Sequence, residues 1–195
     1  GGGNGQYGPE DKIQISGVVR TWDGQPLPDR TEVVLRDPAG RSGGMFSSVS
    51  RKDGTFQIAA NPGRFYVMAS AADGYAPVLS EPFTAGPGAR VEGIELLLGK
   101  GFPGRIQTVD EGGRPIPGVE LIGGYIGRPS DSYSYSNTIK LITDANGVAT
   151  LAHAGAVTMV LEIGADGYES ERVPGLVLQP DQVKIITLKK AQPAT

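Results

Sequence analysis

The sequence predicts an all-β protein built from two consecutive β-sandwich domains, and three observations carry this prediction. Residues 15–28 and 102–117 are two copies of one motif, and each copy is followed by an Asp/Asn-Gly turn and by the tetrapeptide Ala-Asp-Gly-Tyr. The period of roughly 90 residues matches one β-sandwich rather than a short solenoid repeat. The 30 Gly and 15 Pro among the 195 residues fall between apolar runs, as expected when short strands are joined by tight turns.

The apolar pattern predicts about seven strands in each copy, in the Greek-key order of a sandwich, and no helix. Residues 13–19 alternate apolar and polar side chains, which predicts a first strand with one buried face. The Pro-x-Pro segments that follow cannot lie inside a sheet, so they connect the first strand to the second. Further strands are predicted at residues 32–36, 45–51, 55–59, 65–70 and 91–98, and in the second copy at 119–123, 135–143, 148–152, 157–164 and 183–189.

The repeat divides the chain into a flexible leader at residues 1–11, a first sandwich at 12–99, a second at 100–190 and a tail at 191–195. A domain of roughly 100 residues is large enough to fold alone. Residues 99–101 form the whole linker, and three residues span about 10 Å. We therefore expect two domains that sit end to end as a short rod with restricted relative motion.

Charge and composition exclude several classes of partner. The 18 Lys and Arg residues are spread along both copies and are balanced by 21 Asp and Glu, without the concentrated positive field that nucleic acid or an anionic membrane surface requires. The chain has no cysteine, so it can form neither disulfides nor thiolate sites. No run of apolar residues approaches the roughly 18 of a membrane span. The chain opens on Gly1 rather than Met, so we expect its native N-terminus to be missing.

The order of short motifs in both copies resembles the carboxypeptidase regulatory-like domain. The order is Gly-x-Val/Ile, a Gly-rich turn, Pro-x-Pro, a strand, Asp/Asn-Gly-x-Phe and Ala-x-Gly-Tyr, and it covers residues 12–190. This resemblance implies a transthyretin-like (prealbumin-like) seven-stranded sandwich in each copy. It also implies an accessory module of a larger exported protein, whether periplasmic, cell-surface or secreted. The second copy departs from the pattern at Ala149, where Phe56 of the first copy has no aromatic counterpart.

The inventory of reactive side chains argues against an enzyme. His153 is the single histidine, and it falls in an expected turn without a nucleophile-elbow motif nearby. One histidine and no cysteine exclude the usual zinc sites. The Asp-Gly and Asn-Gly turns offer two or three oxygen ligands where Ca²⁺ needs six to eight, and Asx-turn chemistry explains the same residues. We therefore predict no cofactor, no metal and no catalytic residue.

The connection at residues 123–137 is the best candidate for a ligand surface. It combines Tyr, Ser, Gly and Asn, a mixture typical of loop-borne recognition sites. The candidate ligand-binding residues are Tyr125, Arg128, Tyr133 and Tyr135, with Trp22 as a further candidate. The alternative is that Tyr133 and Tyr135 begin a strand and pack across its face. We expect Trp22 at the half-buried edge of the core, with an exposed stacking platform as its alternative.

Two functions from different classes follow. The first is a non-catalytic structural module, a spacer or protein-interaction domain beside other domains of an exported or cell-surface protein. The second is a carbohydrate- or peptide-binding module that uses the Tyr-rich connection of the second copy. Exposed Tyr125 or Tyr133 side chains would favour the second function, and burial of both would favour the first.

Overall fold

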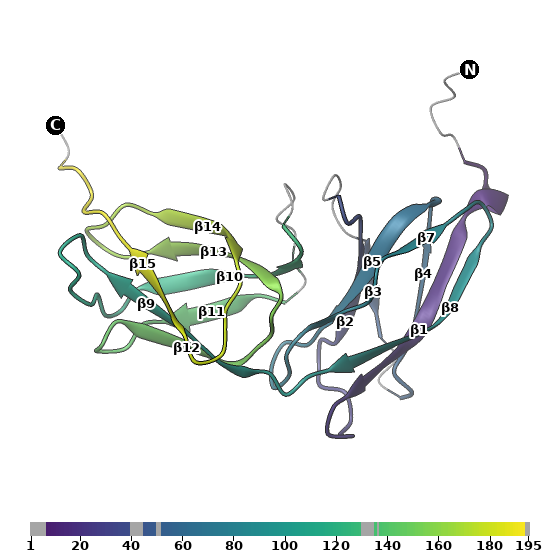
Figure 1. Cartoon of the computed structure of the whole chain (residues 1–195), viewed down its shortest axis with the longest axis horizontal. Coiled ribbons are helices and arrows are strands. Elements are labelled where there is room, and N and C mark those ends of the chain that lie inside the picture. The colour runs from purple at the N-terminus through teal and green to yellow at the C-terminus, as the bar shows by residue number, and fades with distance from the viewer. Residues whose placement is uncertain (1–6, 40–44, 50–51, 130–134, 136, 194–195) are drawn as a thin grey trace, which may run out of the picture.

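A computed structural model describes residues 7–39, 45–49, 52–129, 135 and 137–193 (Figure 1). Its regular elements are one 3-10 turn, η1 (Pro9–Asp11), and the strands β1 (Ile13–Thr21), β2 (Glu32–Arg36), β3 (Met45–Ser48), β4 (Thr55–Ala60), β5 (Gly63–Ser70), β6 (Val78–Leu79), β7 (Phe83–Ala85), β8 (Arg90–Leu98), β9 (Phe102–Val109), β10 (Glu120–Gly127), β11 (Ile139–Ile142), β12 (Val148–Ala154), β13 (Thr158–Gly164), β14 (Glu171–Leu176) and β15 (Val183–Thr187). The predicted all-β class is therefore confirmed. None of the described residues forms a helix long and apolar enough to cross a membrane.

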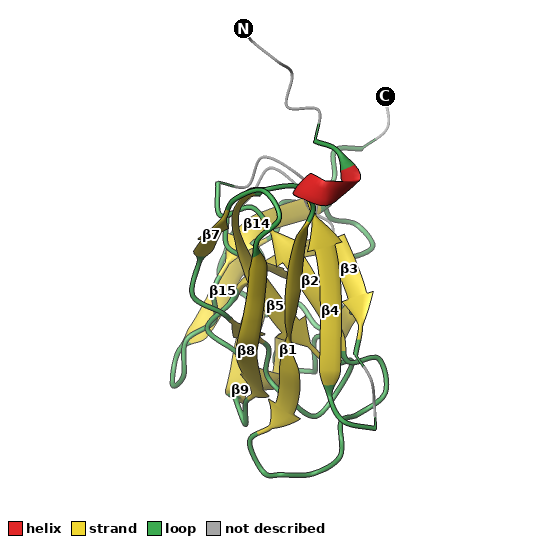
Figure 2. Ribbon diagram, turned by 90° about the vertical axis from the view of Figure 1, so that its right-hand side faces the viewer, coloured by secondary structure: helices red, strands yellow, loops and turns green. Residues whose placement is uncertain are grey.

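The strands before the linker form a first sandwich of two facing sheets. One sheet has the order β4-β1-β8, with β1 antiparallel to β4 and parallel to β8. The other has the order β3-β2-β5-β6, and the short strand β7 also pairs with β5. Figure 2 looks onto the first of these sheets, with β2, β5 and β3 behind it.

The strands after the linker repeat this arrangement as a second sandwich. The sheet β12-β9-β15 corresponds to β4-β1-β8, again with a parallel pair between the first and last strands. The sheet β11-β10-β13-β14 corresponds to β3-β2-β5-β6. Corresponding positions can therefore be compared through the strand registers of the two sandwiches.

Each sandwich has a core of its own. The first core contains fully buried side chains from both sheets, among them Ile15 and Leu98 from one and Val33 and Val67 from the other. The second core is built in the same way, for example from Ile106 and Leu161. These residues alternate with more exposed ones along β1 and β9, as expected for strands with one buried face.

Strand positions follow the predicted pattern, with local differences. The strand β2 has the predicted bounds, whereas β11 is shorter than the predicted range 135–143. The strand β14 was not among the predicted strands. His153 lies in β12 rather than in a turn, because β12 pairs with β9 as far as Ala154.

The two sandwiches do not sit end to end, so that prediction was wrong. One end of the second sandwich packs against the outer face of the sheet that contains β2 and β5 (Figure 1). Val34, Tyr66 and Met68 point outward from this sheet, away from the first core, and each is only 1% exposed. A three-residue linker fixes the distance between the domains but not their angle, and the buried apolar face sets that angle.

Candidate functional site

The contact between the two sandwiches, called the joint below, contains a third cluster of buried apolar side chains, separate from the two cores. Val34, Tyr66 and Met68 of the first sandwich form one apolar cluster with Val157 of the second, and Tyr125 packs against it. Fully burying an apolar side chain of this size stabilises by roughly 1.5–3 kcal/mol. Several such side chains together give a contact that resists thermal opening.

Tyr66 lies at the centre of the joint. Its hydroxyl donates to the carbonyl oxygen of Ile126 at 3.4 Å and accepts from the backbone N–H of Arg128 at 3.1 Å. The Arg128 guanidinium carbon lies 5.2 Å from the centre of the Tyr66 ring, a cation–π contact. Gly127 has φ +93°, and a Cβ there would lie 2.5 Å from the Tyr66 hydroxyl oxygen. Only glycine therefore lets the end of β10 approach the ring so closely.

Buried polar groups surround this contact. Arg36 is opposite Tyr66 in the β2–β5 register and is 3% exposed. Burial lowers the pKa of Arg36, and burial raises the pKa of the Tyr66 hydroxyl. The arginine still carries its charge at neutral pH, because an arginine pKa starts near 12.5.

Tyr125 belongs to the joint and to the second core. Its ring contacts both apolar clusters, and its hydroxyl oxygen accepts from the backbone N–H of Gly155 at 3.2 Å. Burial raises the pKa of Tyr125 to about 12. Its ring is therefore used in packing and its hydroxyl in a backbone hydrogen bond.

The Tyr-rich connection is attached to the first sandwich on both sides. Arg128 makes the contacts with Tyr66 on one side. On the other side, the Asn137 side-chain amide donates to the carbonyl oxygen of Arg30 at 3.1 Å and to the hydroxyl of Ser70 at 3.0 Å. The stems of this connection therefore hold the two sandwiches together.

The linker is also fixed. Gly99 exchanges two backbone hydrogen bonds with Ala76, at 2.9 and 3.1 Å. The His153 Nδ1 atom lies 2.9 Å from the carbonyl oxygen of Lys100. Gly101 has φ +69°, and a Cβ there would lie 2.6 Å from the carbonyl oxygen of Ala154. The single histidine thus contacts the linker backbone.

The structure brings together two of the predicted ligand-binding residues and separates the others. Tyr125 and Arg128 meet in the joint, while half-buried Tyr135 lies against Gly124, where a Cβ would be 2.6 Å from the ring. Tyr133 lies outside the described residues, so the prediction that concerns it remains a prediction.

Trp22 was expected at the edge of the core, and this expectation was wrong. Its side chain is 46% exposed, and the Lys100 Nζ atom lies 5.6 Å from the ring centre. The residue follows the end of β1, on the outward side of the strand, where the opposite sheet cannot cover it. The alternative, an exposed aromatic surface, fits this position.

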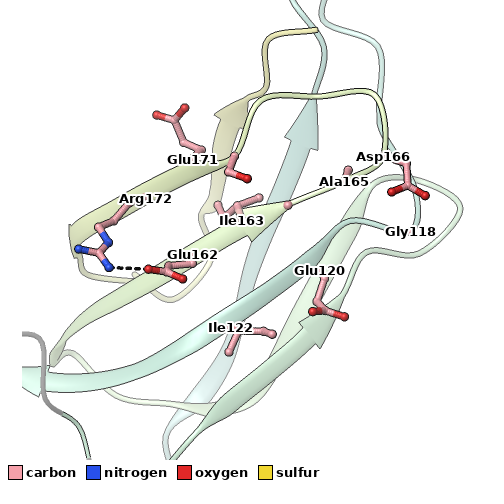
Figure 3. Close-up of a pocket in the computed structure, with 11 residues that line it drawn as sticks. Gly118, Glu120, Ile122, Glu162, Ile163, Ala165, Asp166, Glu171 and Arg172 are labelled. Carbon is pink, nitrogen blue, oxygen red and sulfur yellow. Dashed lines mark hydrogen bonds and ion pairs between the residues drawn. The ribbon is translucent and has the colours of Figure 1, made fainter. Parts of the chain in front are cut away.

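A shallow hollow of about 800 Å³ lies on the outer face of the second sandwich (Figure 3). Its floor includes Ile122, and Arg172 forms an ion pair with Glu162 at its rim. Ile122 pairs with Glu162 across β10 and β13, just as Val34 pairs with Met68 across β2 and β5. The hollow is therefore the counterpart of the joint face, with a charged residue where the joint has methionine.

The acidic side chains of the described residues do not gather into a metal centre. Among these residues, no cluster of three or more His, Cys, Asp or Glu side chains could hold a metal ion. The turn carboxylates serve the backbone instead. Asp144 accepts from the N–H groups of Asn146 and Val148, at 2.9 and 3.0 Å, as expected of an Asx turn.

The joint was missed by sequence reasoning, although the sequence carried a signal for it. The runs Glu-Val-Val-Leu-Arg in β2 and Phe-Tyr-Val-Met-Ala in β5 are apolar on both faces of the strand. Such continuous runs indicate a sheet that is covered on both sides. In a sandwich, the second cover must come from another domain.

No family model and no curated protein sequence matches this chain. Weak structural similarity extends to the Bacillus anthracis TIE protein, with 16% identity and a TM-score of 0.36 over 92% of this chain and 34% of that one. GBS52, the minor pilin of Streptococcus agalactiae, is 13% identical with a TM-score of 0.34, covering 94% and 98%. A DUF3823 family protein from Parabacteroides merdae is 13% identical with a TM-score of 0.34, covering 86% and 98%. At TM-scores below 0.5, none of these similarities bears on the function of this chain.

Proposed function

We propose that this chain is a non-catalytic structural module, in which two β-sandwiches form one rigid unit that serves as a spacer or protein-interaction domain of a larger exported or cell-surface protein. The joint around Tyr66 carries this proposal. A buried aromatic side chain with both hydrogen bonds made to the other domain is expected to hold the domains at a fixed angle. A fixed angle is what a spacer needs to set the position of its neighbours.

The use of the reactive side chains supports the non-catalytic part of the proposal. His153 contacts the linker carbonyl of Lys100, and the hydroxyl of Tyr125 accepts a backbone N–H. The carboxylates of Asp110 and Asp144 accept backbone N–H groups in turns. These side chains therefore stabilise turns and the linker through contacts with the backbone.

We also propose that each sandwich is a carboxypeptidase regulatory-like domain, with the boundaries 12–99 and 100–190. The repeated motif order and the matching strand orders of the two sandwiches support this assignment. The boundary is supported by Gly99, which pairs with Ala76 of the first sandwich, and by β9 of the second sandwich, which begins at Phe102.

Small-angle X-ray scattering of the whole chain tests the rigid unit. The native chain should give a scattering curve that fits one conformation. Val34→Glu places a charge in the closed joint, where burying it without a partner costs several kcal/mol, so the curve should require an ensemble of open arrangements. Ile122→Glu is the matched control, because it changes the corresponding sheet position in the second sandwich, where the side chain lines the shallow hollow.

The outcome separates the alternatives clearly. The rigid unit is supported if the distribution of interdomain arrangements broadens for Val34→Glu but not for Ile122→Glu, while circular dichroism shows that both variants are folded. A native chain that already needs an ensemble of interdomain angles would overturn it.

A carbohydrate- or peptide-binding role is the second candidate, and the exposure of Trp22 favours it. Exposed tryptophan rings stack on sugars and on apolar peptide side chains. Binding to a panel of polysaccharides and peptides, with Trp22→Ala and Tyr133→Ala beside the native chain, tests this role. Saturable binding by the native chain that is lost in either variant would support this role. The absence of binding to every polysaccharide and peptide tested would reject it.

A further inference from the structure

The last strand of the second sandwich, β15, forms an open edge of its sheet. It pairs with β9 over five residues in continuous register, and it has no second neighbour among the described strands. Several other edge strands carry features that block further pairing: β14 contains Pro174, and the pairings of β12 and β8 contain register shifts. The edge strand β11 pairs in continuous register, but it is only four residues long. The strand β15 has neither a proline nor a bulge.

The edge strand β4 also pairs in continuous register, but its exposed side differs. The outward row of β4 is Thr55, Gln57 and Ala59, which offers little apolar surface. The outward row of β15 is Val183, Ile185 and Thr187, all β-branched, with Val183 46% and Ile185 58% exposed. Such side chains favour extended pairing.

The backbone of β15 presents hydrogen-bonding groups on the open side. The N–H of Leu188 donates to the carbonyl oxygen of Val109 in β9 at 2.8 Å. Backbone groups of alternate residues point to opposite sides of a strand, so Ile186 also faces β9, whereas those of Val183, Ile185 and Thr187 face away from it. Within the described part of the chain, no strand pairs with β15 on that side. Just after β15, residues 167–169 take that side, since the N–H of Glu169 donates to the carbonyl oxygen of Lys189 at 2.8 Å, so the open stretch ends at Thr187.

The charges around this edge are mostly positive, in a chain whose net charge is −3. Arg105 is the register partner of Val183 on the outer face. Lys184 lies within the strand and is exposed, and Asp181 precedes the strand. Lys189 and Lys190 follow the open stretch and lie beside Tyr168 and Glu169. An added strand would therefore meet Lys184 as the cation within the open stretch.

A second copy of this chain fits the edge poorly. If two β15 strands paired antiparallel about Ile185, the two Lys184 side chains would be diagonal neighbours, roughly 7–8 Å apart. Like charges on an edge strand are a known way to prevent pairing between copies. An acidic strand would instead place carboxylates beside Lys184, on the sheet face that Lys184 shares with its register partner Ile106.

We propose that the open edge of β15 accepts an extended acidic segment of another protein as an added strand. Backbone hydrogen bonds to Val183, Ile185 and Thr187 would supply the affinity, and the neighbouring cations would select the partner. This inference does not depend on the rigid joint, because β15 lies outside the joint cluster.

The experiment uses the whole chain and blocked nine-residue peptides in which valine alternates with glutamate and threonine. Fluorescence polarisation measures the affinity, and NMR shift changes locate the site. The glutamate peptide should bind at least tenfold more tightly than the same peptide with lysine for glutamate, and it should perturb β15 and β9. Added salt should weaken the binding, because the selecting charges are exposed.

Three variants make the test specific. Ile185→Pro removes the outward N–H at a position where an edge strand tolerates proline, so binding should be lost while the fold remains. Ile185→Thr keeps that N–H and should bind within a few-fold of the native chain. Lys184→Glu should reverse the preference toward the lysine peptide, and it keeps the test decisive if Ile185→Pro fails to fold.

Failure of the glutamate peptide to bind would overturn the proposal. So would binding that Ile185→Pro and Lys184→Glu both leave unchanged. Sedimentation that shows dimers of the native chain, lost in Ile185→Pro, would assign the edge to a second copy and reject the acidic partner.

Discussion

At the scale of single residues, glycine positions decide how closely the two sandwiches approach. Gly127 has a positive φ and lies against the Tyr66 hydroxyl, where no side chain fits. Gly101 has the same property beside the carbonyl oxygen of Ala154. The joint thus depends on the absence of a side chain as much as on the presence of Tyr66.

Gly127→Ala is expected to lower the free energy of unfolding by more than the backbone strain alone would cost. An alanine at positive φ costs roughly 1–2 kcal/mol, and here its Cβ would also press on the Tyr66 hydroxyl oxygen. Gly167→Ala is the control, because Gly167 has φ +84° and no atom within 4 Å of the added Cβ. Urea unfolding should show a loss of stability for Gly127→Ala that exceeds the control by at least about 1 kcal/mol. Equal losses would contradict the close contact.

The raised pKa of Tyr125 predicts that the folded protein loses stability at alkaline pH. Burial raises its pKa from 10.0 to about 12, so the folded state holds the phenolic proton more tightly than the unfolded state does. This contribution is fully present below pH 10 and is lost as the pH rises through about 12. A shift of this size corresponds to on the order of 2–3 kcal/mol.

Urea unfolding of the native chain and of Tyr125→Phe at pH 8, 10 and 11 measures this effect. The native chain should lose stability more steeply between pH 10 and 11 than the variant, which has no phenolic proton at this position. Identical slopes would show that the buried hydroxyl does not control the alkaline limit.

At the scale of elements, buried threonines fix the Pro-x-Pro turn between the first two strands of the second sandwich. Thr108 and Thr143 both donate to the carbonyl oxygen of Ile116, each at 2.9 Å. The Thr143 hydroxyl oxygen also accepts the N–H of Val119 at 2.9 Å. The N–H of Ile116 donates to the backbone carbonyl oxygen of Thr108 at 2.8 Å, and the threonine side chains satisfy the groups of the turn that the backbone does not reach.

Thr143→Val should destabilise the second sandwich by about 1–3 kcal/mol, because it leaves the buried N–H of Val119 without an acceptor. Thr108→Val should cost less, because Thr143 still donates to the Ile116 carbonyl in that variant. Urea unfolding of the two variants compares these costs. A larger loss for Thr108→Val would contradict the assigned hydrogen bonds.

At the scale of the whole molecule, the arrangement follows from which sheet face is apolar. The outward face of β2 and β5 carries Val34, Tyr66 and Met68, and the second sandwich covers it. The corresponding face of β10 and β13 carries Ile122 and Glu162, with the ion pair to Arg172. The two faces have the same backbone but different side chains, which is why the Val34→Glu and Ile122→Glu scattering curves should differ.

The sequence pattern was sufficient to predict the all-β class and most strands. Most strands show a local alternation of apolar and polar residues, and most turns contain Gly, Pro, Asp or Asn. The strand β2 matched its predicted bounds for this reason. The strand β14 was not predicted because Pro174 and Gly175 interrupt its apolar pattern. The exposure of Trp22 was predicted wrongly because a single sequence does not show which side of a strand faces outward.

The sequence by itself determined the repeat, the sandwich architecture, and the absence of cysteine and of a second histidine. Only the tertiary structure decided that Tyr125 and Arg128 lie in a joint with Tyr66, that His153 contacts the linker, and that the sandwiches meet at a sheet face. The reason is the range of the interactions. Strands and turns depend on neighbours a few residues apart, whereas the joint brings together residues from 60 to 107 positions apart in the chain, whose meeting depends on the angle between two folded domains.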